Sequence, residues 1–124
     1  MRCRLEYGRQ GLEVDLPDER VVRVLAYQPA VPLPAPAAAL CDALQDPIGT
    51  PSLRQLAQGK RSACVVVCDI TRPVPNGLIL PPLLETLESA GISRQQIQIL
   101  IATGLHRPTA GGELVETVGA AAAA

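Results

Sequence analysis

Two apolar runs of six residues, with one helical segment between them, constrain the fold of this chain most strongly. Ala63–Cys68 and Ile97–Ala102 are almost entirely aliphatic or small, which is typical of parallel strands covered on both faces. Pro81–Ala90 has leucines at helical spacing and ends at Gly91, and Gly112–Val118 begins another helix. The inward face of the first helix is predicted to carry Leu83, Leu84 and Leu87. This order predicts a βαβ unit with two parallel neighbouring strands.

Short alternating segments predict an antiparallel hairpin near the N-terminus. Arg2–Tyr7 and Gly11–Leu16 flank a glycine-containing turn at residues 8–10. Arg20–Tyr27 is expected to form a third strand. The predicted fold class is therefore α/β, with a parallel or mixed sheet, flanking helices and an N-terminal β-hairpin.

The length of 124 residues indicates one ordinary domain or part of one. We expect the hairpin and third strand over residues 1–28 and the βαβ region of the same domain over 37–119. Alternating prolines over 29–36 exclude a helix or a central strand and predict an extended crossing or linker. Two further helices are expected in the βαβ region. One is Ala37–Gln45, and the other is a short helix that starts within Thr50–Leu53, with Pro51 in its first turn, and runs to Gln58.

Five alanines close the chain at residues 120–124. They are a natural segment, a cloning scar, or residues whose side chains were never assigned. Because the preceding helix has not visibly finished, we infer that the natural protein continues.

Composition excludes several classes of protein. A net charge of −1 and only two aromatic residues argue against a nucleic-acid partner. No apolar stretch approaches the ~18 residues that span a bilayer, and none near the N-terminus resembles a signal peptide. We therefore expect no membrane partner and a cytoplasmic location, where cysteines stay reduced.

The cysteines are not expected to bind metal. There are four: Cys3, Cys41, Cys64 and Cys68. On one strand, Cys64 and Cys68 would lie ~13 Å apart, too far to share an ion. We expect both to be small buried side chains and place no metal ligand in this chain.

Polar side chains gather in the loops that follow the two apolar runs. In open α/β sheets, ligands bind outside the carboxyl ends of the strands, so parallel strands would open both loops into one cleft. The candidate site residues are Asp69, Thr71, Arg72, Thr103, His106 and Arg107. Each has an ordinary structural explanation as well: Asp and Thr close turns, Arg72 pairs with Asp69, and a lone loop histidine is solvated. The glycine-rich nucleotide loops GxGxxG and GxxxxGK[ST] are absent from the sequence.

Three strings, in this order, resemble the N-terminal domain of nickel-dependent lactate racemases. They are Val67–Pro75 (VCDITRPVP), Leu80–Leu84 (LPPLL) and Ile101–Pro108 (IATGLHRP), within the second half of the chain. The resemblance implies an isomerase that interconverts the enantiomers of a small 2-hydroxy acid, with lactate as the default, and a nickel-pincer nucleotide as cofactor. It also implies hydride transfer from C2, a planar 2-keto acid, and hydride return to either face.

The resemblance also suggests roles for the candidate residues. His106 matches one of two catalytic bases, a role that suits imidazole because its ordinary pKa is about 6.5. Arg72 would clamp a carboxylate or phosphate with its planar fork. Asp69 either orients Arg72 or His106 or contacts the substrate, and the sequence leaves this open. Thr71 and Thr103 would offer hydroxyls to the cofactor phosphate, and Arg107 belongs to the same substrate- or cofactor-binding group.

The chain departs from the family in lacking a second catalytic histidine, a cofactor-bearing lysine and a nickel-ligating histidine. Its one lysine, Lys60, precedes the first apolar run and matches no cofactor motif. We therefore expect half a site, inactive alone, with the cofactor mostly held by the missing C-terminal part of the same protein. The alternatives are the same scaffold acting on another 2-hydroxy acid or in another redox isomerisation, and a non-catalytic binding or assembly module.

Overall fold

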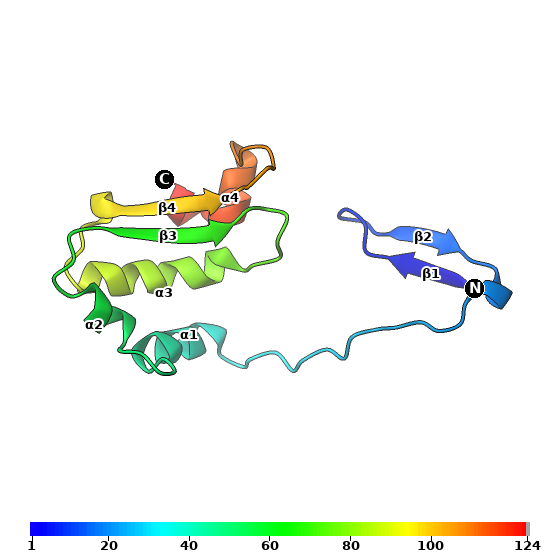
Figure 1. The fold of residues 1–124 in the computed structure, drawn as a ribbon, viewed down its shortest axis with the longest axis horizontal. Helices are drawn as coiled ribbons and strands as arrows, with labels where there is room; N and C mark the ends of the chain where they lie inside the picture. Colours follow the sequence, from blue (N-terminus) through cyan, green and yellow to red (C-terminus); the bar gives the residue numbers. More distant parts are fainter. Residues whose placement is uncertain (124) are drawn as a thin grey trace. The chain divides into compact units, whose positions relative to one another are not determined.

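The computed structural model describes residues 1–123 of the chain, and the elements are shown in Figure 1. The chain forms two compact units that divide between Pro32 and Leu33. This boundary lies within the proline-rich segment, residues 29–36.

The N-terminal unit contains the predicted hairpin. Strands β1 (Arg2–Leu5) and β2 (Leu12–Asp15) pair in antiparallel register. Gly8 and Gly11 have positive φ angles of 56° and 72° in the connecting turn, a conformation that glycine adopts without steric cost. The Arg2 guanidinium donates two hydrogen bonds to the Asp15 carboxylate across the strand pair.

The expected third strand, Arg20–Tyr27, is wrong. The chain instead makes a short 3₁₀ turn, η1 (Asp18–Arg20), and then no regular structure up to the first helix. Among residues 1–123, β1 and β2 pair only with each other, so this segment has no neighbouring strand with which to form a ladder. Val22, Val24, Leu25 and Tyr27 are consequently exposed, Val22 fully.

The second unit is built on two parallel strands. β3 (Ala63–Cys68) and β4 (Ile97–Ala102) pair in parallel, with Ala63 opposite Ile97 and Cys68 opposite Ala102. The predicted bounds and direction of both strands are confirmed. A parallel pair needs a crossover connection, and helix α3 (Asn76–Ser89) provides it.

Helix α3 begins five residues before the predicted start at Pro81, so the loop after β3 is shorter than expected. The buried face of the helix explains the difference: Asn76, Leu80 and Leu84 recur every four residues and all are buried, with Leu80 and Leu84 in the core. Pro81 and Pro82 lie inside the helix and each removes one backbone donor. The buried stripe stabilises the helix through both prolines.

The end of α3 is a Schellman motif centred on Gly91. The Ile92 amide donates to the Leu87 carbonyl (3.2 Å) and the Gly91 amide to the Glu88 carbonyl (3.0 Å), while Gly91 has a φ of 103°. Ile92 is 2% exposed and packs with Leu87 and Ala57. Gly91 therefore stops the helix, as the sequence predicts.

Four shorter helices complete the unit: α1 (Pro36–Gln45), α2 (Leu53–Ala57), α4 (Gly112–Val118) and α5 (Ala120–Ala123), with a 3₁₀ turn η2 at Arg94–Gln96. α2 starts with a capping box, in which the Ser52 hydroxyl accepts from the Gln55 amide and the Gln55 side chain accepts from the Ser52 amide. α1 and α2 contact α3, and α4 contacts both α3 and α5.

Among the described residues of the second unit, 33–123, one face of the two-stranded sheet is packed and the other is not. Alternate residues of each strand pack with α3 and α4 in a core centred on Val67, Leu80, Leu84 and Val118. On the other face, Val66 is 62% exposed and Leu100 is 52% exposed. The expected burial of both faces is therefore wrong, and so is that of Cys64 and Cys68, because both thiols lie on the uncovered face and are exposed.

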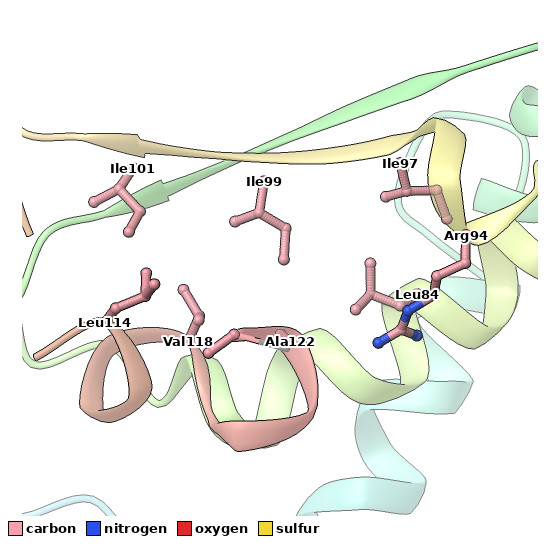
Figure 2. A pocket seen from close by; sticks show the side chains of 9 residues that line it. Leu84, Arg94, Ile97, Ile99, Ile101, Leu114, Val118 and Ala122 are labelled. Carbon is pink, nitrogen blue, oxygen red and sulfur yellow. The ribbon is translucent and has the colours of Figure 1, made fainter. Parts of the chain in front are cut away.

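The packed face has a hollow beneath β4, shown in Figure 2. Side chains of β4 point toward α4 and α5 across a space of about 270 Å³, with Arg94 at one end. The apolar lining includes Ile97, Ile99, Ile101, Leu114, Val118 and Ala122. From α5, Ala122 and Ala123 line this space. None of the helices described within residues 1–123 is both long and apolar enough to cross a membrane.

Candidate functional site

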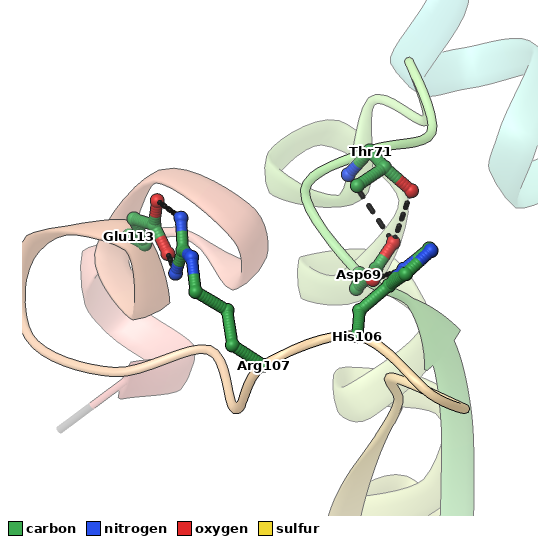
Figure 3. A network of polar contacts seen from close by, with 5 residues as sticks. All are labelled: Asp69, Thr71, His106, Arg107 and Glu113. Atoms are coloured by element: carbon green, nitrogen blue, oxygen red, sulfur yellow. Dashed lines mark hydrogen bonds and ion pairs between the residues drawn. The ribbon is translucent and has the colours of Figure 1, made fainter.

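The loops after β3 and β4 meet at one edge of the sheet. Asp69 directly follows β3, and His106 lies four residues beyond the end of β4. The last residues of these two strands, Cys68 and Ala102, are paired. The Nδ1 atom of His106 lies 2.5 Å from Oδ2 of Asp69, as Figure 3 shows. The predicted convergence of the two loops is therefore confirmed for these two residues.

The Asp69 carboxylate is enclosed by hydrogen-bond donors. Asp69 is only 5% exposed. Its Oδ1 atom accepts hydrogen bonds from the Thr71 hydroxyl (2.6 Å) and the Thr71 amide (3.2 Å). The hydrogen bond from the Thr71 side chain, followed by that from His106, lowers the pKa of the Asp69 carboxyl, although burial opposes the shift. Asp69 is thus an anion at neutral pH.

This charge sets the tautomer of His106. An ionised carboxylate only accepts hydrogen bonds, so the proton in the short contact is on Nδ1 of the imidazole. The neutral ring then carries its lone pair on Nε2, and no hydrogen bond to Nε2 is present among residues 1–123. The His106 side chain is 53% exposed, which leaves Nε2 accessible as a base.

Arg107 takes part in a two-pronged ion pair. Its Nη1 and Nη2 atoms donate to the two carboxylate oxygens of Glu113 at 2.5 and 2.6 Å. Each partner stabilises the charge of the other, so the pKa of Arg107 is raised and the pKa of Glu113 is lowered. In Figure 3 the Arg107 side chain extends away from His106 toward α4.

Arg72 and Thr103 are close to this site in sequence but make different contacts. The Arg72 amide donates to the Asp69 carbonyl (3.1 Å), whereas the Arg72 side chain is exposed and forms no hydrogen bond or ion pair within residues 1–123. The alternative that Arg72 pairs with the Asp69 carboxylate is therefore not what the structure shows. Thr103 is half-buried, and its amide donates to the Ile101 carbonyl (3.0 Å).

A hollow of about 260 Å³ lies at this edge of the sheet. It is lined by Asp69, Ile70, Thr71, His106, Arg107, Thr109 and Glu113. Arg72 and Thr103 are not among the lining residues, so four of the six predicted site residues share this hollow. Thr109 and Glu113 were not predicted. The one sequence signal for Glu113 is an acidic residue in the first turn of a helix, soon after a loop arginine.

A metal centre would need ligands beyond this region. Within residues 1–123, no group of three or more histidine, cysteine, aspartate or glutamate side chains could hold a metal ion. Asp69 and His106 are two side chains of these types, and they are hydrogen-bonded to each other. These side chains fit a proton-transfer pair better than a ligand set.

Comparison with known proteins relates the chain to the N-terminal part of lactate racemases. Residues 7–123 match the family described as the lactate racemase N-terminal domain. The chain is 38% identical over 110 residues to the lactate racemase of Thermoanaerobacterium thermosaccharolyticum. The aligned region covers 85% of this chain and 25% of that protein. It is 45% identical over 76 residues to the lactate racemase of Lactiplantibacillus plantarum, covering 61% of this chain and 18% of that protein.

A solved structure agrees with these matches. The lactate racemase apoprotein from Thermoanaerobacterium thermosaccharolyticum superposes with a TM-score of 0.69 and 35% identity, over 96% of this chain and 27% of that one. The chain thus spans about a quarter or less of the length of these relatives. It belongs to the lactate racemase N-terminal domain family.

Proposed function

We propose that this chain is the N-terminal part of a racemase for a small 2-hydroxy acid of the lactate type, which uses a nickel-pincer nucleotide and works by hydride transfer through a 2-keto acid. The observation that carries this proposal is the 2.5 Å contact between His106 and the buried carboxylate of Asp69 at the ends of two parallel strands. The named activity of the relatives supports lactate as the default substrate.

His106 acts as the base for one enantiomer. Its Nε2 atom takes the proton of the substrate hydroxyl and returns it in the reverse direction. Asp69 acts through His106: it holds the tautomer with the proton on Nδ1 and stabilises the imidazolium that forms when Nε2 accepts a proton. Asp69 is thus a positioning residue in this proposal.

Arg72 binds the substrate carboxylate. A planar guanidinium recognises a carboxylate through two parallel hydrogen bonds, and the fork of Arg107 is already filled by Glu113. The Arg72 side chain is exposed and unpaired within residues 1–123, next to the loop that holds Asp69. Of the two arginines, Arg72 is therefore the one whose two-pronged face has no carboxylate partner within residues 1–123.

The two threonines differ in the same way. The Thr71 hydroxyl donates its single proton to Asp69, so it has no donor left for a phosphate. The Thr103 hydroxyl makes no hydrogen bond within residues 1–123 and remains the candidate donor to the cofactor phosphate.

The nickel-pincer nucleotide, when bound, supplies the acceptor for the hydride at C2. Its metal ligands come from outside residues 1–123, because this part of the chain contains no group of side chains that could hold the ion. The contribution of this chain is the base, the residue that orients it, and the carboxylate clamp.

The test is His106→Ala in the complete polypeptide, with each substrate enantiomer mixed separately in a single turnover and the keto acid trapped. Racemisation should fall ~10²–10⁴-fold in both directions, the usual effect of losing a positioned base. One enantiomer should still yield keto acid, since the opposite base remains, and the other should fail.

Leu105→Ala is the matched control, because Leu105 is a fully exposed neighbour in the same loop. It should behave as the wild type, and circular dichroism should show both variants folded. Equal keto-acid yields from the two enantiomers, or near-normal racemisation in His106→Ala, would exclude His106 as a base.

A further inference from the structure

The loop that carries His106 is attached to the rest of the unit by two adjacent side chains. His106 is tied to Asp69 at the end of β3, and Arg107 is tied to Glu113 in the first turn of α4. The two attachments run in different directions, as Figure 3 shows. Together they fix the backbone of residues 106 and 107 between two separate elements.

The loop itself has little to hold it in place. Gly104 and Gly111 both have φ angles of 58°, which few other residues tolerate, and Gly112 follows at the start of the helix. Two backbone hydrogen bonds, from the amides of Thr103 and His106, hold its first half. A stretch with this glycine content loses much conformational freedom when it is ordered.

The far end of the Arg107 attachment is rigid. Glu113 is the second residue of α4, and the next residue, Leu114, packs against the core that contains the buried Val118. Glu113 also lines the hollow that Asp69 and His106 line. The ion pair therefore connects the loop directly to the packed core.

We propose that Arg107 and Glu113 form a clasp that positions His106 for proton transfer, a role that rests on the proposed function of His106. Neither residue touches the substrate in this proposal. Two parallel hydrogen bonds fix direction as well as distance, which a single ammonium contact does not. A displacement of about 1 Å at a catalytic group lowers its rate by up to about 100-fold, so the clasp acts on turnover.

The test uses Glu113→Gln and Arg107→Lys in the complete polypeptide. Both keep the size of the side chain and remove the two-pronged pair. We expect kcat to fall ~10-fold or more with KM nearly unchanged, because the carboxylate contact of Arg72 is untouched. Amide hydrogen exchange should rise in a peptide covering residues 103–111.

Glu88→Gln is the matched control. Glu88 also pairs with an exposed arginine six residues away, Arg94. This pair is a single 3.4 Å contact, and Glu88 lies at the C-terminal end of α3. It should change neither kcat nor exchange in residues 103–111. The double variant Arg107→Glu/Glu113→Arg re-forms the pair with reversed charges and should recover a large part of kcat.

Wild-type kcat in both Glu113→Gln and Arg107→Lys would overturn the clasp, and so would unchanged exchange of the loop. If the wild-type protein racemises no 2-hydroxy acid, the proposed function fails by itself. The exchange measurement then decides the clasp alone: a rise in Glu113→Gln but not in Glu88→Gln supports it, and no rise overturns it.

Discussion

The two motif arginines, Arg72 and Arg107, differ in what their guanidinium groups contact. Arg107 donates both prongs to Glu113, so its charge is already balanced within the chain. The Arg72 side chain is exposed without a partner in residues 1–123. The two motif arginines thus have separate roles in our proposals, one in binding and one in holding the loop.

Arg72→Lys should be nearly as damaging as Arg72→Ala in the complete polypeptide. Lysine keeps the charge but loses the planar fork that matches a carboxylate, so kcat/KM should fall strongly in both variants. Steady-state kinetics with each enantiomer measures this. Arg61→Lys, an exposed arginine at the opposite end of β3, is the control. Wild-type kinetics in Arg72→Lys would contradict a two-pronged contact.

Asp69 should make the stability of the protein depend on acid pH. Its pKa is lower in the folded state than in the unfolded chain, so its contribution is fully present above the ordinary carboxyl pKa of about 4. The contribution is lost as pH falls through the depressed folded-state pKa. Asp69→Asn should therefore be less stable than the wild type near neutral pH, and the difference should shrink below about pH 4.

Urea unfolding between neutral and acid pH measures this difference. Asp42→Asn removes an exposed carboxylate from α1 and serves as the control for loss of a charge. A difference between wild type and Asp69→Asn that stays constant down to the lowest pH would show that the carboxylate contacts do not contribute to folding.

At the level of elements, α3 is stabilised by its buried stripe. Leu80 is 1% exposed and packs in the main core, so Leu80→Ala should lower the free energy of unfolding by about 2–5 kcal/mol. Leu78 lies in the same helix but is 39% exposed, so Leu78→Ala should have a much smaller effect. Denaturant unfolding of both variants measures the difference, and equal effects would mean that the stripe is wrongly assigned.

The elements that sequence predicts well are those whose signal is contained in their own residues. The aliphatic runs of β3 and β4, and Gly91 after α3, identify these elements with no knowledge of their neighbours. Arg20–Tyr27 was wrongly predicted because a strand also needs a partner, which local alternation does not supply. The predicted start of α3 at Pro81 is too late. In the sequence, Pro81 and Pro82 suggest that the helix begins there, whereas the burial of Leu80 stabilises the helix before them.

The candidate site was predictable in part for the same reason. Parallel strands bring the loops after them together, so the approach of Asp69 and His106 follows from topology. The partner of Arg107 does not, because the path of a nine-residue loop between Ala102 and Gly112 is not encoded in strand order. The exposure of Cys64 depends on what covers a sheet face, which the residues of the strand do not determine.

For the molecule as a whole, the chain spans about a quarter or less of its relatives. We predict that the purified chain alone converts neither lactate enantiomer, even with cofactor supplied. It has one histidine where a two-base mechanism needs two, and residues 1–123 hold no group of metal ligands. Measurable racemisation by the isolated chain would contradict this prediction. It would also contradict the proposal that the second base and the metal ligands come from outside this chain.

The contact between Asp69 and His106 joins residues 37 positions apart in the chain. This separation affects the order of events during folding. The contact closes only after β3 and β4 have paired, and such non-local pairing is slow because loop closure precedes any gain from the contact. The hydrogen bonds of helix α3 join residues only a few positions apart, and helix formation is local and fast. During refolding, the far-ultraviolet signal of this helix should therefore begin to return before the imidazole acquires its fixed tautomer. The base thus matures after the helix that connects the two strands.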